Sequence, residues 1–212
     1  MVIHKYKLVF VGIPKNASHA PLYALSDDIE TGHNHAPYPK LVKEYGKKLI
    51  SSYTSFAIVR NPYDRAYSAW NFLTRIEYLA DRFKVNSFEE YVYALKNKNA
   101  FYIKNDPEQR DEELTEHELT WPQYKFITRG KKILVDHILR METLDKDWKK
   151  FIKEYNKTAE VKINCSLEDL NSMEYEERDW TKIYTPEMYK IINKFYKKDF
   201  ELFGYEMITN NG

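Results

Sequence analysis

Lys15 lies in a segment whose residue types suit the binding of an anion. Residues 12–19 read GIPKNASH and directly follow an apolar run. Small residues let backbone N–H groups converge on an anion, and the lysine adds a full positive charge. The segment departs from the nucleoside-triphosphate pattern, GxxxxGK followed by Ser or Thr, because its lysine comes early. An ordinary kinase or GTPase is therefore disfavoured, and a plain strand–helix connection is the alternative for this segment alone.

Arg60 and Ser68 form a second group of anion-binding types. Residues 56–70 read FAIVRNPYDRAYSAW, so Arg60 directly follows an apolar run. Ser68 lies about two helical turns after Asn61. A guanidinium offers a planar fork for phosphate, and a serine hydroxyl can donate to another oxygen of the same group. Arg65 is open to interpretation as a surface or structural ion-pair residue. A capped helix with an incidental arginine is the alternative here.

His33 and His35 are the candidates for proton transfer. Between the two segments the chain reads TGHNHA over residues 31–36. An attacking hydroxyl needs a base whose pKa lies near the operating pH, usually His or Glu. The alternative is a pair of surface loop histidines. A His-x-His pair also suggests a metal, but the sequence offers no third ligand, so no metal site is predicted.

Strands and helices must position these groups. Residues 6–12 and 54–60 are apolar and rich in β-forming types, which predicts two buried strands. Asn61, Pro62 and Asp64 then supply an N-cap, a first helical residue and an acid in the first turn. A third strand is predicted within residues 132–141. Helices are predicted from 18 to about 27, from 62 to about 83, and near 87–97, 143–155 and 185–200.

This alternation predicts an α/β fold. We expect a three-layer sandwich with a mainly parallel central sheet and a P-loop-like strand–loop–helix unit, in a single domain over residues 1–212. Ligands of such folds bind beyond the carboxyl ends of the strands, where both anion-binding segments lie. The acidic segment 104–118 is assigned no chemistry.

Composition excludes several classes of protein. The net charge of +1 argues against non-specific nucleic-acid binding, and 43% hydrophobic residues can bury a core. Cys165 is the only cysteine, so no intrachain disulfide can form and a reducing compartment is indicated. No apolar run approaches the roughly 20 residues that span a bilayer, and the early strand leaves no room for a signal peptide. We expect a cytoplasmic protein, unless the chain is a truncated luminal domain.

Together the two segments resemble motifs of sulfotransferases that use 3′-phosphoadenosine 5′-phosphosulfate (PAPS), especially the carbohydrate-type members. Residues 13–18, IPKNAS, resemble their 5′-phosphosulfate loop, and residues 59–69, VRNPYDRAYSA, resemble their 3′-phosphate motif. Weaker similarities follow in the family's order. Residues 139–144, LRMETL, resemble an R-x-E-x-L segment, and residues 199–205, DFELFGY, resemble the end of a C-terminal helix.

The resemblance implies transfer of a sulfuryl group from PAPS to an acceptor hydroxyl, on a carbohydrate or similar molecule. The product would be adenosine 3′,5′-bisphosphate, and no metal is required. Lys15 would stabilise charge on the leaving nucleotide, while Arg60 and Ser68 would hold the 3′-phosphate. The residues that would hold the 5′-phosphosulfate are Pro14, Lys15, Asn16, Ala17, Ser18 and His19.

The resemblance also suggests residues for the acceptor. Residues 31–36 resemble a Gly-His segment that carries the catalytic histidine in some relatives, which favours His33, with His35 next. Residues 116–124 resemble a region lining the acceptor cleft, so His117 and Gln123 are predicted to contact substrate, and a solvated helix is the alternative for His117. The acceptor itself is not specified.

One departure from the family pattern keeps other functions open. Relatives often have a pair of hydroxyl residues where this chain has His19-Ala20. An inactive relative that binds a nucleotide or a protein partner is therefore an alternative. An atypical small-molecule kinase is another.

Overall fold

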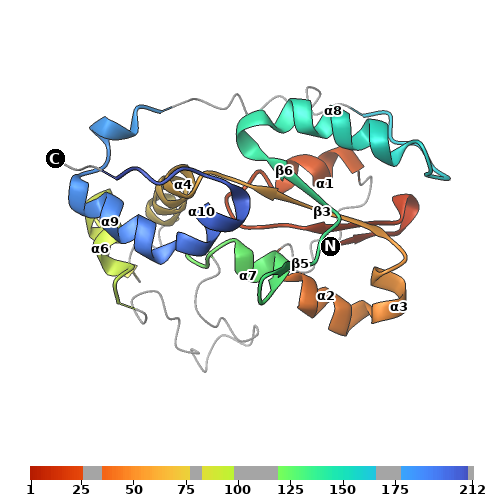
Figure 1. Cartoon of the computed structure of the whole chain (residues 1–212), viewed down its shortest axis with the longest axis horizontal. Helices are drawn as coiled ribbons and strands as arrows, with labels where there is room; N and C mark the ends of the chain where they lie inside the picture. The colour runs from red at the N-terminus through yellow and green to blue at the C-terminus, as the bar shows by residue number, and fades with distance from the viewer. Residues whose placement is uncertain (26–34, 77–82, 98–118, 166–177, 210–212) are drawn as a thin grey trace. The chain divides into compact units, whose positions relative to one another are not determined.

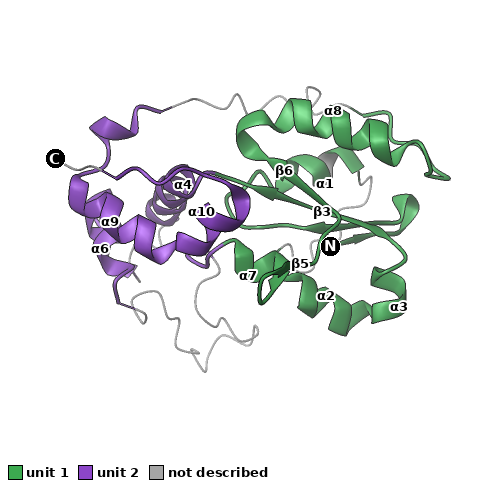
Figure 2. Ribbon diagram, in the orientation of Figure 1, with its two compact units in different colours: residues 1–60, 123–176 green, residues 61–122, 177–212 purple. Residues whose placement is uncertain are grey.

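The computed structural model describes residues 1–25, 35–76, 83–97, 119–165 and 178–209 (Figure 1). The chain divides into two compact units, one formed by residues 1–60 and 123–176 and the other by residues 61–122 and 177–212 (Figure 2). Each unit is described by itself. The single domain expected from the sequence stays a prediction.

The first unit is built on a four-stranded sheet in the order β1-β2-β3-β6. Strand β1 (Val2–Ile3) is antiparallel to β2 (Leu8–Val11), while β3 (Thr54–Val59) runs parallel to both β2 and β6 (His137–Arg140). All four residues of β2 are buried, as expected for a parallel strand covered on both faces. The short 3₁₀ helix η1 (His4–Tyr6) joins β1 to β2.

Helices cover both faces of this sheet and complete three layers (Figure 2). On one side lie α1 (His19–Leu25) and α8 (Leu144–Tyr155), the latter preceded by η2 (Met141–Thr143). On the other lie α2 (Tyr38–Tyr45), α3 (Lys47–Ile50) and α7 (Tyr124–Ile127). The predicted α/β three-layer sandwich with a mainly parallel sheet is confirmed.

Aromatic packing joins the layer of α8 to the sheet. The ring of Phe56 on β3 stacks on Phe10 of β2 at 4.7 Å between centroids and lies 4.8 Å from Phe151 of α8. The strands that lead to Lys15 and to Arg60 are therefore held by a continuous apolar core.

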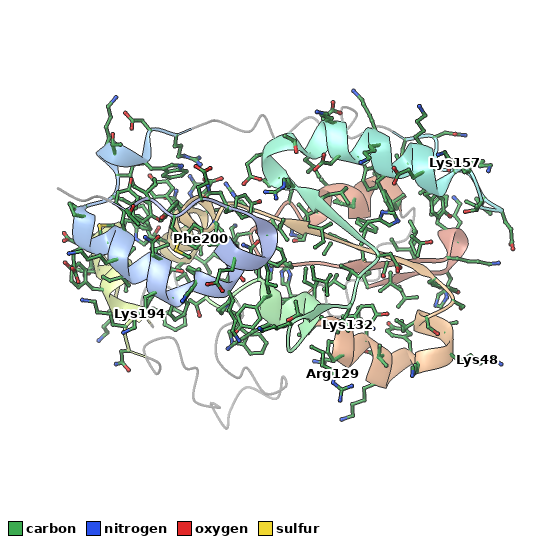
Figure 3. The ribbon with its side chains drawn as sticks, viewed as in Figure 1. Lys48, Arg129, Lys132, Lys157, Lys194 and Phe200 are labelled. Carbon is green, nitrogen blue, oxygen red and sulfur yellow. The ribbon has the colours of Figure 1, made fainter. Side chains whose placement is uncertain are left out.

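Charged side chains of this unit lie on its surface. Lys48 and Lys132, both labelled in Figure 3, are exposed.

The third predicted strand is β6, which occupies only the later part of residues 132–141. A hairpin of β4 (Thr128–Arg129) and β5 (Lys132–Ile133) comes first, turning at Gly130, whose φ is 66°. The N–H of Asp136 then donates to the carbonyl of Ser55 at 3.0 Å, which brings residues 137–140 alongside β3. Long-range pairing therefore decided which part of residues 132–141 joined the sheet.

The second unit is helical. The helices among its described residues are α4 (Pro62–Arg75), α6 (Phe88–Ala94), η4 (Trp180–Lys182), α9 (Pro186–Phe195) and α10 (Lys197–Phe203). The predicted start of α4 is confirmed, because the Asn61 side chain accepts from the N–H of Tyr63 at 2.9 Å. The helix predicted over 185–200 is two helices that meet at Tyr196. The end predicted near 83 for α4 is wrong, because the helix ends at Arg75 and the backbone of Ile76 is extended. Residues 77–82 lie outside the described residues.

Buried tyrosines dominate the core of the second unit. Tyr184 donates to the carbonyl of Tyr63 at 2.8 Å, and Tyr196 donates to the carbonyl of Thr120 at 3.1 Å. The ring of Phe200, which is labelled in Figure 3, belongs to this core; its centroid lies 5.0 Å from that of Tyr63. These phenols have exchanged water for fixed hydrogen bonds inside an apolar core.

The buried tyrosines make the protein sensitive to alkali. Burial raises the pKa values of Tyr63 and Tyr196 to about 12. Unfolded tyrosines lose their protons near pH ~10, so above that pH the unfolded state binds fewer protons than the folded state. We therefore expect the free energy of unfolding to fall as pH rises from about 10 to about 12. Chemical denaturation at a series of pH values measures this. Stability that stays constant over this range would contradict the expectation.

Candidate functional site

The turn around Lys15 contains two residues with left-handed backbone. It connects the end of β2 at Val11 to the start of α1 at His19. Lys15 and Ala17 have φ values of 67° and 51°, in the left-handed region that costs a non-glycine residue about 1 kcal/mol or more. Left-handed residues within a turn make successive N–H groups converge, which forms a concave site for an anion. The strand–loop–helix arrangement expected from the sequence is present.

Arg60 reaches this turn from the neighbouring strand. Its guanidinium Nη1 donates to the carbonyl oxygen of Lys15 at 2.8 Å, and the residue is 9% exposed. Strands β2 and β3 run parallel and in register, so Gly12 and Arg60 leave the sheet at the same edge. The two cations that the sequence placed in separate motifs therefore lie in one part of the first unit.

The side-chain amides of Asn16 and Gln123 form a buried pair that contacts Arg60. Asn16 donates through Nδ2 to the carbonyl of Ile58 at 2.8 Å and to Oε1 of Gln123 at 2.7 Å. The same Gln123 oxygen accepts from the Arg60 N–H at 2.9 Å, and Gln123 Nε2 donates to the Arg60 carbonyl at 2.8 Å. Asn16 and Gln123 are both 0% exposed. Sequence reasoning missed this contact because no local pattern relates residues so far apart.

His35 lies against the same turn. Its Nδ1 is 2.9 Å from the carbonyl oxygen of Gly12, and the residue is half-buried. A carbonyl oxygen only accepts hydrogen bonds, so Nδ1 must carry the proton. In the neutral ring the lone pair is then on Nε2, the state that a general base requires. His33 and His117, the other histidines singled out from the sequence, lie outside the described residues.

Ser68 is half-buried on α4 in the second unit. One turn earlier on that helix, Asp64 is fully buried and accepts from Arg178 at 2.7 Å. The Arg178 guanidinium also lies 5.4 Å from the ring centre of Tyr67, which places a cation near Ser68 along the helix. No sequence pattern singled out Arg178. Its ion pair with Asp64 is seen only in the structure.

Arg65 has a structural role in the second unit. It is 1% exposed and donates to the carbonyls of Trp121 at 2.8 Å and Leu119 at 3.3 Å. Its guanidinium also lies 6.0 Å from the ring centre of Tyr196. The sequence left open a surface residue or a structural ion-pair residue. Burial excludes the surface residue, and the partners of Arg65 include backbone carbonyls.

The described residues contain neither a metal-binding cluster nor a membrane-spanning helix. In that part of the chain, no three His, Cys, Asp or Glu side chains converge as they would around a metal ion. None of the helices described there combines the length and apolar character needed to cross a bilayer.

Comparison with known proteins identifies the family of the chain. The family model described as "Sulfotransferase family" matches residues 1–206. The chain therefore belongs to the sulfotransferase family, whose enzymes transfer sulfuryl groups. No curated protein and no solved structure matches the chain.

Proposed function

We propose that this protein transfers a sulfuryl group from PAPS to a hydroxyl group of a carbohydrate. The observation that carries the proposal is the hydrogen bond from Arg60 to the Lys15 carbonyl. It brings together cations from the segments that resemble the 5′-phosphosulfate loop and the 3′-phosphate motif. A donor with two separate anionic groups fits that combination better than a donor with one phosphate chain.

The residues of the Lys15 turn fit a phosphosulfate. When bound, PAPS supplies a sulfuryl group attached to a phosphate that can leave. The converging N–H groups would hold its oxygens, and the Lys15 ammonium would stabilise negative charge that develops as the nucleotide leaves. Arg60 would hold the 3′-phosphate, and Ser68 stays a predicted contact of the same group. These tasks are positioning and charge stabilisation, which dominate in-line transfer reactions of this kind.

His35 is the proposed base for the acceptor. As the acceptor oxygen attacks sulfur, the hydroxyl proton would pass to Nε2 of His35, and the bond from sulfur to the leaving phosphate oxygen would break. The hydrogen bond between Nδ1 and the Gly12 carbonyl at 2.9 Å sets the ring tautomer for this step. The sequence favoured His33, and the position of His35 beside the turn now favours the second candidate.

Lys15→Ala should lower transfer of radiolabelled sulfate from PAPS to an array of glycans by about 10²–10³-fold, because a charge-stabilising group is lost. Lys40→Ala is the matched control, since Lys40 is an exposed lysine of α2, and it should leave transfer unchanged. Full activity of Lys15→Ala would contradict the assigned role. Wild-type protein that binds PAPS but transfers nothing to any acceptor would favour the inactive-relative alternative.

Arg60→Ala should weaken binding to immobilised adenosine 3′,5′-bisphosphate, since the proposed partner of the 3′-phosphate is removed. For the wild type, PAPS should compete for this binding and ATP should not. Competition by ATP alone would instead favour the atypical kinase.

His35→Ala should reduce kcat/KM by about 10²–10⁴-fold and remove the loss of activity at low pH, because the group that must be deprotonated is gone. His33→Ala is the control and should keep the pH profile of the wild type. The opposite result for the two variants would identify His33 as the base. Near-normal turnover of both would show that neither histidine is the base.

A further inference from the structure

We propose that Gln123 is a positioning residue that sets the geometry between the Lys15 turn and Arg60. This inference rests on the proposed function, because it concerns the donor site. It assigns Gln123 a task other than the substrate contact predicted from the sequence. The residue is 0% exposed, and its side-chain amide forms hydrogen bonds with both Asn16 and Arg60.

Gln123 binds the backbone at the end of β3. The strand ends at Val59, so the peptide groups of Arg60 lie beyond the ladder. The side-chain amide of Gln123 binds both of them, accepting from the N–H at 2.9 Å and donating to the C=O at 2.8 Å. This is the paired donor and acceptor that a neighbouring strand would otherwise provide. Two bonds to one residue orient its backbone and therefore the direction in which the Arg60 side chain leaves.

Gln123 also binds the Lys15 turn through Asn16. The Gln123 oxygen that accepts from Arg60 also accepts from Asn16 Nδ2 at 2.7 Å. Asn16 lies between the two left-handed residues of the turn, and the Arg60 guanidinium returns to the Lys15 carbonyl at 2.8 Å. Lys15, Asn16, Gln123 and Arg60 thus form a closed circuit in which one amide touches both anion-binding segments.

The circuit also contains a group that lowers stability. Asn16 Oδ1 is buried and has no hydrogen-bond partner among the residues that the structure describes. A buried acceptor without a donor costs free energy, and so do the left-handed backbones on either side of it. Such costs persist where the surrounding structure imposes a particular geometry, which favours a functional reason for this arrangement over stability alone.

The chemistry of the circuit requires an amide. Asn16 and the Arg60 N–H need an acceptor, while the Arg60 carbonyl needs a donor. In Gln123→Met these groups lose their partner, although the side chain keeps a similar length. In Gln123→Glu the carboxylate faces the Arg60 carbonyl without a proton between them. Only its protonated form supplies both an acceptor and a donor, so this variant should recover at low pH.

The test measures affinity for adenosine 3′,5′-bisphosphate by calorimetry, together with KM for PAPS, KM for the acceptor and the thermal midpoint. Gln123→Met should weaken bisphosphate binding and raise KM for PAPS by roughly tenfold or more, leaving KM for the acceptor unchanged. Ser55→Ala is the matched control. Ser55 is 1% exposed near the other end of β3 and donates to Asp136 at 2.7 Å, so its loss should lower the thermal midpoint without affecting bisphosphate affinity.

Gln123→Glu separates positioning from simple destabilisation. Its affinity relative to the wild type at the same pH should approach one at low pH and fall as pH rises. A Gln123→Met variant that is destabilised like Ser55→Ala but binds the bisphosphate normally would overturn the proposal, as would a ratio for Gln123→Glu that does not change with pH. A change confined to KM for the acceptor would restore the substrate-contact interpretation. Wild-type protein that fails to bind the bisphosphate at all would overturn the proposed function, and this inference with it.

Discussion

The candidate site depends on two parallel strands that end side by side. Strands β2 and β3 pair in register from Leu8 with Thr54 to Val11 with Ala57, so the chain leaves both strands at one edge of the sheet. That pairing allows the Arg60 guanidinium to bind the Lys15 carbonyl at 2.8 Å. Without it, the two cations would belong to unrelated loops. The apolar core therefore holds in place the two strands after which Lys15 and Arg60 follow.

Polar groups in the interior set directions that apolar packing leaves open. Apolar side chains contribute most of the burial, but they attract one another without strong directionality. The Asn16 and Gln123 amides orient the Lys15 turn and Arg60, and Arg65 orients the backbone near residue 120 in the second unit. Arg60 and Arg65 are five residues apart in the sequence. Even so, Arg60 donates to the carbonyl of Lys15, whereas Arg65 donates to backbone carbonyls of the second unit. The partners differ because Arg60 follows a strand and Arg65 lies on a helix.

Local patterns predicted the parts of the fold that local physics controls. The buried runs at 6–12 and 54–60 contain β2 and β3, since continuous apolar segments of this length are typical of parallel strands. The Asn-Pro start of α4 was predictable because a cap depends on neighbouring residues. The third strand lies within the predicted segment 132–141, but only pairing with β3 selected residues 137–140 of it. The break at Tyr196 between α9 and α10 had no local signal that we recognised.

Residue type and spacing alone identified the two motifs that indicated the family, because motifs are short and continuous in the chain. Only the tertiary structure decided how those motifs meet. Gln123 lies 107 positions from Asn16 and 63 from Arg60, and His35 lies 23 positions from Gly12. Hydrogen bonds over such separations depend on where the sheet brings the chain together. A pattern of neighbouring residues therefore does not predict them.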